Sequence, residues 1–170
     1  MNNKGSTSSL GLGMIIIACL LFLAIMTFGF NKHLDQQNNP NQNISAERKN
    51  NIAEVRLKQN RYGHYVVNGQ INNTPVTFLL DTGATVISIP EKIANRLQLK
   101  RGYPMQSRTA NGSITVYDTR LDRVSIGAIK LNNIRASINP YMNGDEILLG
   151  MSFMKHLEMI QKGKELILRY

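Results

Sequence analysis

The chain has 170 residues, 42% of them hydrophobic, which suits one packed domain with an appended segment and excludes wholesale disorder. Basic residues outnumber acidic ones by 20 to 11, giving a formal net charge of +9. A single cysteine and three histidines exclude an intramolecular disulfide and a Cys/His zinc cluster. No Walker or G-x-G-x-x-G string is present, so the common phosphate-binding loops are also absent from the sequence.

The first apolar segment follows a short tail of residues 1–9. Residues 10–30 carry no charge, and as a helix they would be about 31 Å long, close to the roughly 30 Å hydrocarbon core of a bilayer. We therefore predict a transmembrane helix. A cleaved signal peptide is an alternative, although its apolar region is usually shorter. Ile17-Ala18-Cys19 loosely resembles a lipoprotein cleavage site, but the apolar residues that follow favour an ordinary apolar Cys19.

Residues 31–51 are rich in Asn and Gln, contain Pro40 and have no apolar period, which predicts a flexible linker. Residues 52–170 then read as one globular domain made mostly of short strands. Asn111-Gly112 lies between two strand-forming runs and predicts a hairpin tip. Glu91 to Leu99 and Met151 to Leu157 predict short helices. This pattern indicates a mainly β, closed or strongly curved fold.

One carboxylate stands out in the domain because of its neighbours. Asp81 follows the apolar run Phe78-Leu79-Leu80 and precedes Thr82-Gly83-Ala84. A buried carboxylate is costly unless it is hydrogen-bonded or functional, and Gly83 permits a tight turn. A strand that ends in an Asp-containing turn is also common, so these residues alone leave a catalytic and a structural role open.

The string Leu79 to Ala84 resembles the active-site motif of retropepsin-like aspartic proteases. Those enzymes also carry a flap hairpin and, later, two apolar residues and a glycine leading into a short helix. Thr109 to Ser113 lies where the flap should be, and Ile147 to Met154 fits the later pattern. The resemblance covers nearly the whole domain. It implies a retropepsin-like closed β-barrel, the single lobe of an acid protease, preceded by the transmembrane helix.

The resemblance also implies a role for each residue of the motif. Asp81 matches the catalytic aspartate. Thr82 matches the threonine whose hydroxyl hydrogen-bonds across the subunit boundary and holds two active-site loops together. Gly83 and Ala84 match the glycine of the triplet and the small residue after it.

Two more elements are implied as support for the site. Gly150 matches the glycine that packs close to the active-site loop. Asn111 and Gly112 match only the general position of the flap tip, because the glycine run of the retroviral flap is missing. No cofactor or metal is expected for this chemistry.

Aspartic protease chemistry uses two facing carboxylates that hold one proton between them. Because this chain has one Asp-Thr-Gly, we expect the second carboxylate to be Asp81 of a partner chain in a two-fold homodimer. The prediction is a membrane-anchored aspartic endopeptidase that acts on peptides or proteins. The alternative is a catalytically inactive retropepsin-like module that binds peptides or holds partners together at the membrane.

The charge and the anchor bear on where the protein acts. The positive charge indicates a solvated basic surface, with anionic lipid as a second interpretation. Nucleic acid is not an expected partner, because no aromatic stacking motif accompanies the charge. Basic residues flank residues 10–30 on both sides, so the positive-inside rule does not decide the orientation. The resemblance is closest to the bacterial branch with one amino-terminal membrane helix, which implies the bacterial inner membrane and a periplasmic protease domain.

Overall fold

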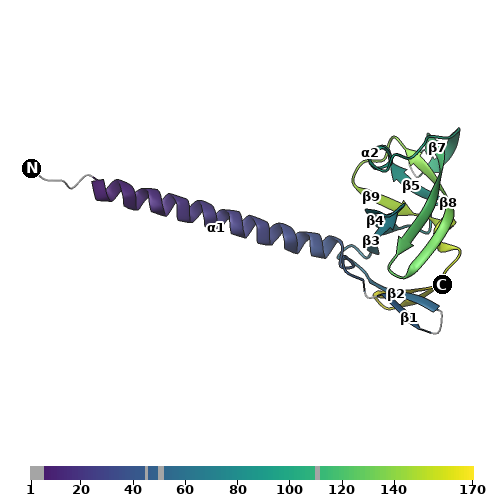
Figure 1. Cartoon of the computed structure of the whole chain (residues 1–170), viewed down its shortest axis with the longest axis horizontal. Coiled ribbons are helices and arrows are strands. Elements are labelled where there is room, and N and C mark those ends of the chain that lie inside the picture. The colour runs from purple at the N-terminus through teal and green to yellow at the C-terminus, as the bar shows by residue number, and fades with distance from the viewer. Residues whose placement is uncertain (1–5, 45, 50–51, 110–111) are drawn as a thin grey trace, which may run out of the picture. The chain divides into compact units, whose positions relative to one another are not determined.

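The structure, a computed structural model, describes residues 6–44, 46–49, 52–109 and 112–170. Its contacts divide the chain into two compact units. The first ends at Gln37, and the second spans Asn38–Tyr170. The first unit is helical and the second consists mainly of strands (Figure 1).

The helix of the first unit is α1 (Ser6–Asn38), which contains all of the predicted span and continues beyond it. The stretch Gly11–Asn38 has a mean hydropathy of 2.6 over its most apolar window, and that window is not buried. By length and composition α1 could cross a membrane, and a signal sequence has the same properties. The helix ends two residues before Pro40, as expected because the residue before a proline disfavours helical backbone.

The expected linker, residues 31–51, is structured over much of its length. It is helical to Asn38, and Asn39 and Asn41 are buried. The Asn41 side chain donates to the carbonyl oxygens of Lys58 (2.9 Å) and Val66 (2.7 Å), and the Lys58 N–H donates to Asn41 Oδ1 (2.7 Å). One of the asparagines that suggested a linker, Asn41, therefore joins two strands through its side-chain amide. The folded unit begins before residue 52.

Short strands make up most of the second unit. In chain order its elements are β1 (Ala46–Lys49), β2 (Ile52–Lys58), β3 (Val66–Ile71), β4 (Thr74–Leu80), β5 (Ile87–Pro90), α2 (Glu91–Arg96), β6 (Pro104–Thr109), β7 (Gly112–Ile126), β8 (Ile129–Asn139), β9 (Glu146–Leu149), α3 (Met151–Met154), β10 (Glu158–Lys162) and β11 (Glu165–Arg169). The two predicted short helices correspond to α2 and α3.

The larger sheet closes on itself. Its strand order is β3-β4-β9-β5-β8-β7-β6, and an additional pairing of β3 with β7 completes a ring from which only β6 is left out within the described residues (Figure 1). The pairs β4–β9 and β5–β8 are parallel, whereas the other pairings are antiparallel. Phe78, Ile147 and Phe153 are fully buried inside the unit. The predicted mainly β, closed-barrel fold is confirmed.

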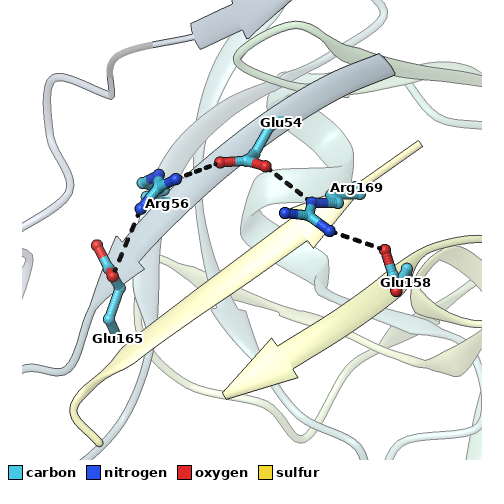
Figure 2. A network of polar contacts seen from close by, with 5 residues as sticks. All are labelled: Glu54, Arg56, Glu158, Glu165 and Arg169. Atoms are coloured by element: carbon cyan, nitrogen blue, oxygen red, sulfur yellow. Dashed lines mark hydrogen bonds and ion pairs between the residues drawn. The ribbon is translucent and has the colours of Figure 1, made fainter. Parts of the chain in front are cut away.

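A smaller antiparallel sheet has the order β1-β2-β11-β10. Leu166 and Leu168 of β11 belong to the hydrophobic core. The other face of this sheet carries the charged network drawn in Figure 2. In that network Glu54 accepts from Arg169 (2.8 Å) and pairs with Arg56 (2.8 Å). Strand β11 is paired on both edges, with β2 and with β10, so its own edges are closed to a partner chain.

Candidate active site

Asp81 lies where two parallel strands end together. Strands β4 and β9 are in register with Leu80 opposite Leu149, so the residues that follow, Asp81 and Gly150, leave the sheet side by side. The Asp81 N–H donates to the Leu149 carbonyl oxygen (3.2 Å), which continues the ladder by one step. The apolar run that precedes Asp81 in the sequence is therefore a barrel strand, and the motif is the turn at its end.

The carboxylate of Asp81 is held by its own turn. Oδ1 accepts from the Gly83 N–H (2.8 Å), and the Ala84 N–H donates to the Asp81 carbonyl oxygen (3.3 Å). Asp81 is partly exposed, and Thr82 and Gly83 are exposed. Within the described residues Oδ2 has no hydrogen-bond partner, so one carboxylate oxygen is fixed by the backbone and the other is available to solvent or to a second chain.

Gly150 packs directly against the backbone of the turn that carries Asp81. A Cβ at this position would lie 2.3 Å from the Val86 carbonyl oxygen and 2.6 Å from the Ala84 carbonyl oxygen. Both atoms belong to the backbone, so they cannot move aside as a flexible side chain would. The next residue, Met151, donates its N–H to the Ala84 carbonyl oxygen (2.8 Å). The start of α3 thus supports the loop that carries Asp81.

Ser152 adds a contact that the sequence analysis did not find. Its N–H donates to the Thr85 carbonyl oxygen (2.9 Å). Its Oγ accepts from the Ile87 N–H (3.1 Å) and donates to the Arg135 carbonyl oxygen (2.8 Å). One hydroxyl therefore connects α3, β5 and β8 at the exit of the active-site loop. The only sequence signal was its place two residues after Gly150.

The hairpin expected as a flap is formed by β6 and β7. Thr109 is opposite Gly112, and the Thr109 hydroxyl donates to the Gly112 carbonyl oxygen (2.9 Å). Gly112 has φ of +117°, which favours glycine. Asn111 lies outside the described residues. The hairpin is therefore present, and the function of its tip remains a prediction.

Two other carboxylates of the domain are engaged in ion pairs. Asp118 pairs with Arg135 (3.2 Å), and Asp145 pairs with Lys92 (3.1 Å). Among the described residues no group of three or more His, Cys, Asp and Glu side chains is placed to hold a metal ion. Among the carboxylates that the structure describes, Asp81 is thus the one that combines the motif, the turn and an oxygen without a hydrogen-bond partner.

Comparisons with known proteins agree with this geometry. The sequence model of the family described as "gag-polyprotein putative aspartyl protease" matches residues 67–156. The crystal structure of a retropepsin-like aspartic protease from Rickettsia conorii is 30% identical, has a TM-score of 0.62, and is matched over 75% of this chain and 96% of that one. The barrel therefore has the retropepsin-like fold that the motif suggested.

Two curated relatives extend the comparison. The "Uncharacterized protein in cobV 5'region" of Sinorhizobium sp is 33% identical over 111 residues, which are 64% of this chain and 48% of the relative. The "Uncharacterized protein RP867" of Rickettsia prowazekii (strain Madrid E) is 29% identical over 120 residues, 69% of this chain and 51% of the relative. The chain spans about half the length of these relatives.

Proposed function

Because this chain belongs to the retropepsin-like aspartyl protease family whose model it matches, we propose that it is a membrane-anchored aspartic endopeptidase that works as a homodimer. The observation that carries the proposal is the Asp81 carboxylate on a loop supported by Gly150: Oδ1 accepts from the Gly83 N–H, and Oδ2 has no hydrogen-bond partner in the part of the chain that the structure describes. Peptide or protein chains are the proposed substrates.

A single chain supplies only half of the proposed site. Two Asp81 carboxylates brought face to face cannot both ionise, so the pair retains one proton. The ionised carboxylate takes a proton from a water molecule, whose oxygen attacks the carbonyl carbon of the peptide bond. The protonated carboxylate donates to the carbonyl oxygen, and a proton then passes to the leaving amine as the C–N bond breaks.

The exposure of the turn is consistent with a partner at this face. Thr82 and Gly83 are exposed although they immediately follow a barrel strand. In the proposed dimer the Thr82 hydroxyl hydrogen-bonds across the subunit boundary, so the exposed side chain becomes part of the contact that positions both Asp81 residues. Gly83, Ala84 and Gly150 maintain the shape of the loop. Gly112 is the proposed flap residue within the described part of the chain, and a flap role for Asn111 stays a prediction from the sequence.

The helix α1 is the proposed anchor. Its apolar stretch is long enough to cross a bilayer once. We propose a single-pass protein of the bacterial inner membrane with its protease domain on the periplasmic side. Two chains confined to one membrane meet at a raised effective concentration, which favours a weak dimer.

The test is digestion of a peptide library by the purified full chain in detergent micelles, from pH 3 to pH 8, beside the Asp81→Asn variant. We expect cleavage by the unmodified chain and none by the variant, with the far-ultraviolet circular dichroism of the two unchanged. If neither protein cleaves any peptide, the proposal fails and the inactive peptide-binding module becomes the better account. Equal cleavage by both would assign the activity to a contaminant.

A further inference from the structure

A cavity of about 270 Å³ lies along the strand that ends at Asp81. Leu79 of β4 lines it, together with Val66 of β3, which is opposite Leu79. Successive side chains of a strand point to opposite faces, so Leu79 and Asp81 share one face. At 3.3 Å per residue, Leu79 lies about 7 Å from Asp81 along the strand. The cavity is therefore within reach of a side chain whose backbone is bound at the Asp81 carboxylate.

Glu146 of β9 lines the same cavity. In the parallel pair of β4 with β9, Leu148 is opposite Leu79, and Glu146 is two residues before Leu148. Because side chains alternate along a strand, these three residues lie on one face of the sheet. Glu146 is partly buried and lies farther from Asp81 than Leu79 does. A side chain that enters the cavity from Asp81 thus meets an apolar wall first and a carboxylate second.

The Glu146 carboxylate has neither an ion pair nor a hydrogen bond among the described residues. The preceding carboxylate, Asp145, pairs with Lys92 (3.1 Å). Arg61 also lines the cavity, but its guanidinium lies over the Tyr62 ring, 4.6 Å from the centroid, and hydrogen-bonds the Tyr62 hydroxyl. A partly buried carboxylate without a partner gains most from a cation supplied by another molecule.

The loop that forms another wall of the cavity is held by its own hydrogen bonds. Asn60 Oδ1 accepts from the N–H groups of Tyr62 (2.9 Å) and His64 (2.9 Å). The Asn60 N–H donates to the His64 carbonyl oxygen (2.8 Å), which closes the loop. All three residues line the cavity. Because this wall is already ordered, binding of a side chain requires little reorganisation.

We propose that this cavity binds a lysine or arginine side chain of the substrate, and that Glu146 selects it. The selected residue is one of the two joined by the cleaved bond. Lysine and arginine have an apolar stem and a cationic end, which match the wall of Leu79 and Val66 and the carboxylate beyond it. At about 270 Å³ the cavity is smaller than those that enclose whole small molecules, and it suits a single side chain.

The inference rests on the proposed function, because it names the class of substrate that the proposed protease cleaves. In the proposed homodimer, two-fold symmetry places one such cavity on each side of the paired aspartates. Each residue of the cleaved bond then has its own cavity. Peptides with a basic residue at either position are therefore expected substrates, and peptides with basic residues at both are expected to be the best ones.

Other side chains suit the cavity less well. A hydrocarbon side chain would take water from the Glu146 carboxylate without replacing its hydrogen bonds, and an acidic side chain would bring a like charge beside it. A site with a polar group placed for a ligand discriminates strongly against an analogue that lacks the matching group. We therefore expect lysine to be preferred over norleucine, which has a similar stem without the ammonium group, by about tenfold.

The first test is digestion of a peptide library that contains norleucine, with mass spectrometry of the products. In the products of the unmodified chain, lysine and arginine should be enriched about tenfold over norleucine beside the cleaved bond. Glu146→Gln keeps the size of the side chain and should lose this enrichment while still cleaving. Glu146→Lys should favour aspartate and glutamate instead. The matched control Asp145→Asn removes the neighbouring, exposed carboxylate and should retain the enrichment.

The second test measures binding without cleavage. Fluorescent octapeptides that differ only in a central lysine pair or norleucine pair are titrated with the full-length Asp81→Asn chain in non-ionic detergent micelles, and anisotropy is recorded. This chain should bind the lysine peptide about tenfold more tightly, and adding Glu146→Gln should abolish the difference.

Equal binding of the two peptides by the Asp81→Asn chain, or a library enrichment that Glu146→Gln leaves unchanged, would overturn the role of the cavity. Cleavage of the library by the unmodified chain would still support the proposed function in that case. Conversely, lysine-selective binding that depends on Glu146, without cleavage of any peptide, rejects the proposed function and keeps the cavity as a binding site for basic side chains.

Discussion

At Gly150 the structure leaves no room for a side chain. A Cβ would approach the carbonyl oxygens of Val86 at 2.3 Å and Ala84 at 2.6 Å. Replacing Gly150 by Ala should therefore displace the Asp81 loop and lower the free energy of unfolding by about 2 kcal/mol, within the range of overpacked cores. Urea unfolding followed by tyrosine fluorescence measures this loss, since the chain has no tryptophan.

The matched control is Gly29→Ala, where a Cβ would find no atom within 4 Å. This variant should unfold as the unmodified chain does. A Gly150→Ala protein of unchanged stability would mean that the backbone contact is not as tight as the structure has it.

The residues of the site differ in how far the sequence alone could identify them. Asp81 and Gly150 could be selected as candidates, and their positions at the ends of paired strands expected, because each follows an apolar run within a short, recognisable string. Ser152 could not be selected, because its partners Ile87 and Arg135 are distant in sequence and become neighbours only when the barrel closes. No local sequence pattern predicts a hydroxyl that hydrogen-bonds two backbone groups distant in the chain.

Among the elements, the segment before β1 depends on Asn41. The side-chain amide of Asn41 hydrogen-bonds the backbone of Lys58 and Val66, and Asn41 is 4% exposed. Asn41→Ala would remove the donor to the buried Val66 carbonyl oxygen, at a cost of about 1–3 kcal/mol. We expect the free energy of unfolding to fall by about 2 kcal/mol, measured by urea denaturation. Asn43→Ala, in the same segment but exposed, should have no measurable effect.

The same segment shows why element boundaries were harder to predict than the fold. The closed barrel follows from many short strands that alternate with turn residues. A polar stretch such as residues 31–51 reads as a linker because composition cannot reveal that Asn41 has a long-range backbone partner. Likewise, polar residues after Phe30 did not indicate that α1 would continue to Asn38.

The charged network of the smaller sheet makes the stability of the fold depend on pH. The hydrogen bond from Arg169 holds the pKa of Glu54 below its ordinary value of 4.5, with a further contribution from Arg56. A carboxylate whose pKa is lowered on folding stabilises the protein above its unfolded pKa, and this stabilisation is lost as pH falls through the lowered folded value. Glu54→Gln should therefore lower the thermal midpoint at pH 7, and the difference from the unmodified chain should vanish as pH falls well below 4.5.

Thermal unfolding at a series of pH values between 7 and 3 measures this difference. Asp122→Asn provides the control, because Asp122 is exposed on β7 and has no ion pair within the described part of the chain. A gap between Glu54→Gln and the unmodified chain that persisted at pH 3 would show that the glutamine disturbs packing rather than charge.

At the scale of the whole molecule, the proposed dimer makes a stoichiometric prediction. When the Asp81→Asn chain is reconstituted with an equal amount of unmodified chain in the same vesicles, random pairing turns half of the unmodified chains into mixed dimers. A mixed dimer has one carboxylate and cannot share a proton across two aspartates. Cleavage per unmodified chain should therefore fall to about half when pairing is complete, as expected for a two-fold site.

The result depends on pairing of the chains in the membrane. In the control, the same mixture of chains is reconstituted with more lipid, so that the chains are diluted before they associate. Undiminished cleavage at every ratio of Asp81→Asn to unmodified chain would mean that one chain is sufficient for catalysis, which the single Asp-Thr-Gly turn does not explain.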